Sequence, residues 1–149
     1  MANAREIERL PFHDQLTAYI QSIDDAYPLE LAYLFGSYAK GTGHRESDID
    51  VALLFKQTYT QAEELLLLGR LMDEGAKRLD RKVDIVFLHR ASPLLRYEVV
   101  RHGIVLKDSP QRASFESLAI REYFDFRYYA ETYNQAALQR IAGGAGFER

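Results

Sequence analysis

Three aspartates have the residue type and spacing that suit the binding of a hard cation. Asp48 and Asp50 are two residues apart where an apolar run begins, so in a strand both side chains would point to one face. Mg²⁺ prefers oxygen ligands, taken from one or two carboxylates together with substrate phosphates. The pair therefore predicts a magnesium site that also receives a phosphorylated substrate.

Asp84 is the third of these residues and lies in the otherwise apolar segment KVDIVFL. A carboxylate among apolar neighbours needs a partner or a metal, because burying a bare charge is costly. If the strand carrying Asp84 lies beside the strand carrying Asp50, the three carboxylates can hold two metal ions. Two such ions clamp the attacking and leaving oxygens of an in-line phosphoryl displacement.

A glycine-serine pair, Gly36-Ser37, ends another apolar run and is separated from Asp48 by ten residues. A turn at this point exposes backbone N–H groups to an anion, and glycine lets a triphosphate come close to the backbone. Ser37 would add a hydroxyl donor, and Lys40 would add a nearby cation. Gly36, Ser37 and Lys40 are therefore the predicted nucleotide-binding residues.

Strand and helix patterns alternate around these residues, which predicts an α/β or α+β domain with a small mixed sheet flanked by helices. The predicted strands span residues 29–35, 49–55, 82–88 and 104–107. The predicted helices span residues 11–25, 61–79, 93–101 and 115–140, with a helical turn and a loop over 38–47. Ser92 is the expected N-cap of the third helix, with Pro93 at its first position.

The apolar faces of two helices lead to further expectations. The helix over 61–79 should be anchored by Leu65, Leu68, Leu71, Met72 and Leu79. In the last helix we expect Phe115, Phe126 and Tyr133 to pack on the sheet. The remaining aromatics cannot all share that face, and exposed aromatics suit a partner or self-association surface on this helix. They are Tyr123, Phe124, Tyr128 and Tyr129, close to Arg121 and Arg127.

Composition limits the class of protein. A chain of 149 residues is expected to form one domain over 1–149, here with a C-terminal helical extension over 109–142 and a flexible tail over 143–149. The lack of cysteine excludes disulfides and thiolate metal sites and favours the cytoplasm. The first ten residues lack the apolar core of a secretory signal, and no apolar run is long enough to cross a bilayer.

Charge and size narrow the choice of partners. A net charge of −3 gives no basic footprint for nucleic acid. The chain is also too short to combine a catalytic domain with a separate recognition domain. If it is an enzyme, we expect either a small substrate or one that another chain presents.

The stretch GSYAKGTGHRESDID with the following VALLF, and the segment VDIVFL, resemble the DNA polymerase β-type nucleotidyltransferase superfamily. The segments SPLLRYEVVRHGIVLKD and REYFDFRYY resemble its minimal nucleotidyltransferase (MNT) group, the antitoxins of HEPN-domain toxins. This resemblance implies a polymerase-β-like fold with a C-terminal helix. Many members carry arginine where this chain has Lys40, and lysine cannot make arginine's planar bidentate contact.

The resemblance also implies an activity, the transfer of AMP from ATP to a tyrosine hydroxyl of a cognate HEPN RNase toxin. Asp48 and Asp50 would hold the metal that bridges the triphosphate. Together with Asp84 they would hold the catalytic metal, and Asp84 would help to deprotonate the acceptor. The implied cofactor is Mg²⁺, as two ions, and the implied partners are ATP and the toxin, without direct nucleic-acid or membrane contacts.

Two other functions stay open at this stage. A small nucleotidyltransferase of the same superfamily could modify an antibiotic hydroxyl, and an antitoxin could act without catalysis by covering the toxin's active site. His44 and Arg45 also have two interpretations, since they could be solvated loop residues or could approach the nucleotide.

Overall fold

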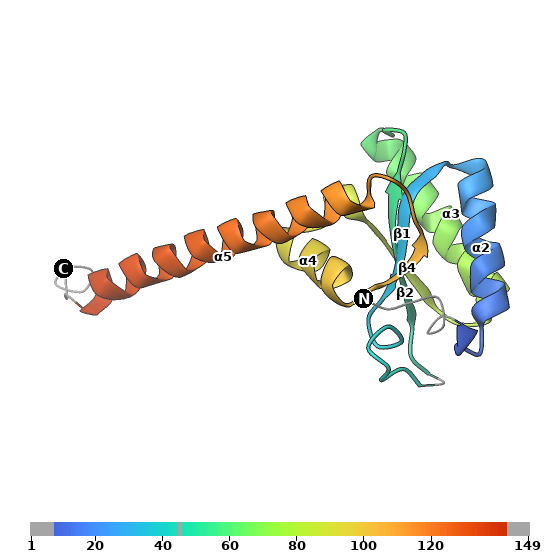
Figure 1. Ribbon diagram of the computed structural model, residues 1–149, viewed down its shortest axis with the longest axis horizontal. Coiled ribbons are helices and arrows are strands. Elements are labelled where there is room, and N and C mark those ends of the chain that lie inside the picture. The colour runs from blue at the N-terminus through green and yellow to red at the C-terminus, as the bar shows by residue number, and fades with distance from the viewer. Residues whose placement is uncertain (1–7, 45, 143–149) are drawn as a thin grey trace.

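A four-stranded mixed sheet organises the chain (Figure 1). The computed structural model describes residues 8–44 and 46–142. The predicted tail, 143–149, and Arg45 lie outside the described residues. The helical extension predicted over 109–142 falls within them, whereas a single domain over the whole of 1–149 stays a prediction.

The strands follow the apolar runs of the sequence within a residue at each end. Their order in the sheet is β3-β2-β1-β4. Their bounds are β1 Leu29–Phe35, β2 Ile49–Phe55, β3 Val83–Phe87 and β4 Ile104–Lys107. β1 pairs antiparallel with β2 and with β4, whereas β2 pairs parallel with β3. The mixed sheet expected from the sequence is confirmed, and its one parallel pair joins the two strands that carry Asp50 and Asp84.

Helices cover both faces of this sheet (Figure 1). On one face lie α2 (His13–Ala26) and α3 (Gln61–Leu79). On the other face lie α4 (Pro93–His102) and the beginning of α5 (Arg112–Ala142), after a short 3-10 helix η1 (Leu88–Arg90). The sheet therefore separates two apolar clusters.

The larger cluster lies between the sheet and α2 with α3. Thr60 begins α3 with a capping box, in which its side chain accepts from the backbone of Glu63 and the Glu63 side chain accepts in return. The expected anchor Leu65 is wrong, because this side chain is 71% exposed. Consecutive helical residues are about 100° apart, so only part of a leucine run can face the sheet. The buried residues of α3 are Glu64, Leu67, Leu71, Gly75 and Leu79.

The smaller cluster lies under α4. It contains Leu31, Tyr33, Ala52, Leu88 and Val99, with Phe115 of α5 packed against it. The predicted N-terminus of α4 is confirmed, because the Ser92 side chain accepts from the backbone N–H of Leu95 and Pro93 follows Ser92.

The second half of α5 leaves the body of the molecule (Figure 1). This helix has 31 residues, which corresponds to a length of about 46 Å. Its contact with the body includes the stack of Tyr123 on Tyr97 of α4, with ring centroids 3.9 Å apart. Further along α5, Phe126 is 50% and Tyr133 is 68% exposed, so the expectation that these two rings pack on the sheet is wrong.

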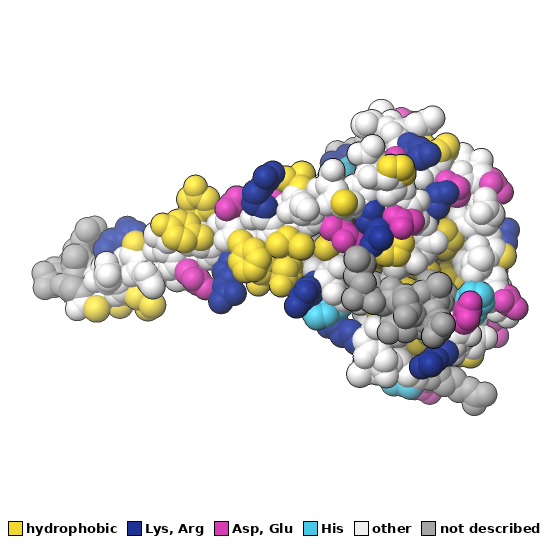
Figure 2. All heavy atoms as spheres, in the orientation of Figure 1, with side chains coloured by type: hydrophobic (Ala, Val, Ile, Leu, Met, Phe, Trp, Pro, Cys, Tyr) yellow, Lys and Arg dark blue, Asp and Glu magenta, His cyan; other side chains and the backbone are white. Residues whose placement is uncertain are grey.

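Phe126 and Tyr133 are exposed because α5 is much longer than the elements it packs on. α4 has only ten residues, and the body of the molecule ends beside the first half of α5. Figure 2 shows apolar side chains along this projecting part.

No helix within 8–44 and 46–142 is both long and apolar enough to span a membrane.

Candidate active site

The sheet register brings the predicted aspartates together. In the parallel pair β2–β3, Asp50 lies directly opposite Asp84. Ile49 and Val51 belong to the cluster on the α2–α3 side, so Asp50 between them points to the α4 side of the sheet. Asp84, directly opposite on the neighbouring strand, takes the same face, and Asp48 immediately precedes β2. Three residues that the sequence places up to 36 positions apart therefore meet at one end of two adjacent strands.

A lysine, Lys82, lies among these carboxylates. Its Nζ is 3.6 Å from Asp48 Oδ2 and 3.9 Å from Asp84 Oδ1. The Lys82 carbonyl accepts a hydrogen bond of 3.0 Å from the backbone N–H of Ile49, which ties the start of β2 to the residue before β3. The sequence contained a signal for this residue, because it precedes Asp84 by two positions and so shares its face. Sequence reasoning did not use that signal.

The charges of the three aspartates act on one another. Burial, followed by the neighbouring charges of Asp84 and Asp48, raises the pKa of Asp50 to about 6, although the charge of Lys82 acts in the opposite direction. The side chains of Asp48 and Asp84 are 40% and 38% exposed, so a ligand can reach the group from solvent. The arrangement is a partly buried, negatively charged site that favours the arrival of a cation.

The donor set fits a divalent metal ion of the kind that binds oxygen. Within the described part of the chain, no group of three or more His, Cys, Asp or Glu side chains is arranged so that it could hold a metal ion as it stands. Asp48, Asp50 and Asp84 nevertheless supply only carboxylate oxygens, which are the ligands of hard cations. Their mutual repulsion is also what a cation would relieve. These residues fit such an ion by their chemistry, and the register places Asp50 and Asp84 directly opposite each other.

Gly36 lies next to Asp50, at a position that only a residue without a side chain can fill. It follows β1, whose last residue, Phe35, pairs with Asp50, and it has a φ of +77°. A Cβ added to Gly36 would lie 2.1 Å from Asp50 Oδ2. The sequence interpretation assigned Gly36 to the approach of a triphosphate. The structure adds a second reason for glycine, because the carboxylate itself takes the space.

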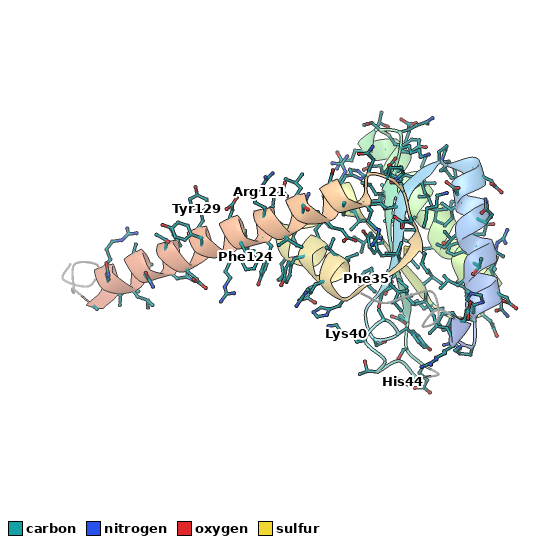
Figure 3. The ribbon with its side chains drawn as sticks, in the orientation of Figure 1. Phe35, Lys40, His44, Arg121, Phe124 and Tyr129 are labelled. Atoms are coloured by element: carbon teal, nitrogen blue, oxygen red, sulfur yellow. The ribbon has the colours of Figure 1, made fainter. Side chains whose placement is uncertain are left out.

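The turn after Gly36 has the expected form of one helical turn followed by a loop. The backbone N–H of Lys40 donates to the Gly36 carbonyl at 3.1 Å, and that of Thr42 donates to the Ser37 carbonyl at 2.9 Å. Lys40 lies on the α4 side of this loop, where its Nζ is 3.8 Å from Glu98 of α4 (Figure 3). The structure thus places Gly36 against the carboxylates, with Ser37 directly after it, and pairs Lys40 with α4.

Tyr38 supports the same loop from within. Its hydroxyl donates to the His44 carbonyl and accepts from the Arg81 guanidinium, and its ring fills the space beside Gly43. The guanidinium also lies 5.1 Å from the centre of the Phe12 ring. Tyr38 and Arg81 were missed by sequence reasoning, because a contact across 43 residues leaves no local pattern. They fix the loop between Ser37 and Asp48 to the segment that leads into β3.

Comparison with known proteins is consistent with this geometry. The family model described as "Polymerase beta, Nucleotidyltransferase" matches residues 18–112. The protein adenylyltransferase MntA of Shewanella oneidensis is 44% identical over 80 residues, which are 54% of this chain and 55% of that protein. The chain therefore spans about half the length of the curated relative that it matches.

Solved structures extend the similarity over more of the chain. A toxin-antitoxin complex with AMP-PNP contains a chain that is 32% identical with a TM-score of 0.65, over 87% of this chain and 98% of that one. A complex of the tri-AMPylated Shewanella oneidensis HEPN toxin with MNT antitoxin gives 29% identity and a TM-score of 0.63, over 83% and 98%. The family match covers more than half of the chain, and the fold agrees with it: this chain belongs to the polymerase β nucleotidyltransferase family.

Proposed function

We propose that this chain is an antitoxin that transfers AMP from ATP to a tyrosine hydroxyl of a HEPN-domain toxin. The observation that carries the proposal is the group of three carboxylates, with Asp50 and Asp84 in register and Asp48 beside them. The similarity to chains in toxin-antitoxin complexes, one with AMP-PNP and one with tri-AMPylated toxin, supports the choice of donor and acceptor.

Asp48, Asp50 and Asp84 would hold the divalent metal, which we propose to be Mg²⁺ in two ions. When bound, the metal neutralises charge on the triphosphate and on the pentacoordinate transition state. In the reaction, the tyrosine oxygen forms a bond to the α-phosphorus, the bond to the bridging oxygen breaks, and pyrophosphate leaves. Asp84 would accept the tyrosine proton, and Ser37 with the N–H groups of its turn would bind phosphate oxygens.

The exposure of the carboxylate group supports an acceptor that arrives on another protein. The carboxylate group is open to solvent, and the sheet with its helices uses most of the described residues. A folded partner can bring its own recognition surface to such an open site. The cytoplasm, where ATP is abundant, is the compartment that we propose for this reaction.

The test is an intact-mass measurement. The protein is incubated with the HEPN protein encoded beside it, ATP and Mg²⁺, and the partner should gain the mass of one or more AMP groups. Asp48→Ala should abolish the gain, whereas Asp73→Ala, which removes an exposed carboxylate of α3, should preserve it. A partner without added AMP, or an equal gain with Asp48→Ala, would contradict the proposal.

The projecting aromatic helix favours a second candidate, neutralisation by binding alone. The exposed Phe124, Phe126 and Tyr129 of α5 suit contact with a protein partner. This candidate predicts that a variant with both Asp48→Ala and Asp50→Ala still protects cells from the toxin. Loss of protection in that variant, with the complex still formed, would favour catalysis.

A further inference from the structure

We infer that Lys82 is a built-in counter-cation of the carboxylate group, which competes with the divalent metal for Asp48 and Asp84. It is a positioning residue and has no part in the chemical step. The inference rests on the proposed function for one point only, that these aspartates bind the metal.

The geometry places one ammonium among three negative charges. Lys82 Nζ lies 3.6 Å from Asp48 Oδ2 and 3.9 Å from Asp84 Oδ1, and its charge also acts on Asp50. An ammonium carries three donors on a flexible stem and can face two carboxylates at once. The divalent ion would need the same oxygen atoms, so the two cations exclude each other.

The contact is also easy to release. The Lys82 side chain is 66% exposed, and exposed ion pairs contribute little to stability because water competes for both charges. Lys82 therefore offsets the repulsion among the three carboxylates while no metal is bound. Its side chain can move away into solvent when a metal arrives. The backbone bond between the Ile49 N–H and the Lys82 carbonyl keeps the strand in place when the side chain leaves.

The consequence concerns the order in which metal and nucleotide bind. A metal ion that arrives without nucleotide must displace Lys82 and gains only the carboxylates as protein ligands. A metal that arrives with a triphosphate brings phosphate ligands of its own, which Mg²⁺ commonly retains in nucleotide sites. Lys82 thus weakens the binding of metal alone and favours filling of the site by the metal–nucleotide complex.

The test measures the affinity of the nucleotide-free protein for Mn²⁺, by the electron paramagnetic resonance signal of the unbound ion. Lys82→Met should bind Mn²⁺ about five- to tenfold more tightly than wild type at low ionic strength. The advantage should shrink as salt is added, because screening weakens the competing charge. Lys82→Arg retains a cation and should resemble wild type.

Lys77→Met is the matched control, since Lys77 is an exposed lysine of α3 that pairs with Asp73 at 3.0 Å, outside the carboxylate group. It should leave the affinity for Mn²⁺ unchanged. A merely structural role for Lys82 would lower thermal stability without tightening metal binding. Lys82→Gln provides a second uncharged variant should Lys82→Met fold poorly.

Equal or weaker binding of Mn²⁺ by folded Lys82→Met or Lys82→Gln would overturn the inference. The measurement needs neither toxin nor AMP transfer, so failure of the proposed acceptor leaves it intact. Asp48→Ala supplies the other distinction. If wild type and Asp48→Ala bind Mn²⁺ equally, the metal site itself is wrong, and both the inference and the proposed chemistry fail together.

Discussion

At the scale of single residues, the site depends on the absence of a side chain at Gly36. The carboxylate of Asp50 lies where a Cβ would be, and the backbone of Gly36 has a positive φ. Two demands therefore fall on one position, one from the conformation of the backbone and one from its neighbour. Gly41 shares the same φ of +77° but has nothing within 4 Å of an added Cβ.

These two glycines allow the demands to be separated. Gly36→Ala should lower the free energy of unfolding by about 2–4 kcal/mol, from strain and overlap together, and should abolish AMP transfer because Asp50 must move. Gly41→Ala should cost only about 1 kcal/mol and retain activity. Chemical denaturation and the mass assay measure both effects. Equal loss of activity in the two variants would mean that backbone strain alone matters.

The pKa of Asp50 predicts a pH dependence of activity. Burial, with the charges of Asp84 and Asp48, raises this pKa to about 6, and only the ionised carboxylate can serve as a metal ligand. AMP transfer should therefore increase with pH through about 6 and level off above it. An initial-rate profile with ATP and metal well below saturation measures this, because the rate then reports ionisation of the unoccupied site. A rate that is constant between pH 5 and 7 would contradict the role of Asp50.

The same pKa predicts that Asp50 destabilises the fold at neutral pH. The folded protein holds this proton more tightly than the unfolded chain does, so stability is greater below the unfolded pKa of about 4 and is lost as pH rises towards 6. Asp50→Asn should raise the Tm by about 2–4 °C at pH 7.5, after allowance for solvent screening, and should leave it unchanged at pH 4. A lower Tm at pH 7.5 would contradict this sign.

At the scale of elements, the start of α3 is joined to η1 by a buried acid. Glu64 is 8% exposed, and its carboxylate contacts the ring Nε2 of His89 and, at 2.6 Å, the Nε of Arg90. The positive end of the helix dipole favours acids in the first turn of α3, where both Glu63 and Glu64 lie. The structure gives each a specific partner, Thr60 for Glu63 and the pair in η1 for Glu64.

This contact predicts a difference between two acids of the same helix. Glu64→Ala should lower the free energy of unfolding by about 1.5–3 kcal/mol, since hydrogen bonds to a charged, buried group are lost. Asp73→Ala removes an exposed partner of Lys77 and should change it by less than about 0.5 kcal/mol. Urea denaturation distinguishes the two variants, and similar values would show that the buried contact contributes nothing.

The elements themselves follow closely from the sequence, but their pairing does not. Apolar runs and Ser92-Pro93 predicted the strands and the start of α4, because these signals are local. Asp50 and Asp84 lie directly opposite each other in the sheet. The sequence predicted this only on the condition that their two strands are neighbours, because local patterns do not determine which strands pair. The contacts of Tyr38 with Arg81 depend on the same tertiary arrangement and were not foreseen.

At the scale of the whole molecule, α5 divides into a half that packs and a half that projects. The apolar pattern of α5 continues past Tyr123, so the pattern alone could not reveal where the body ends. Phe115 and Tyr123 contact the body, whereas Phe126 and Tyr133 are largely exposed. The interpretation of the exposed aromatics as a partner or self-association surface stays a prediction.

The division predicts opposite effects of similar substitutions. Phe126→Ser and Tyr133→Ser should leave the stability of the isolated protein within about 0.5 kcal/mol of wild type, since these rings are exposed. Tyr123→Ser should lower it by about 1–2 kcal/mol, because the stack on Tyr97 is lost. Thermal denaturation of the purified chain measures both. A large loss with Phe126→Ser would mean that the projecting half is covered in solution.

The length of α5 also determines how the molecule moves through water. A chain of 149 residues folded into a sphere would have a radius of gyration of about 15 Å. A helix about 46 Å long that leaves the body adds mass far from the centre. X-ray scattering should give a larger radius and a distance distribution with a long tail. Rotation about the axis of α5 should be faster than end-over-end rotation. NMR relaxation of amides whose N–H bonds lie along α5 should therefore differ from that of amides whose N–H bonds are perpendicular to it.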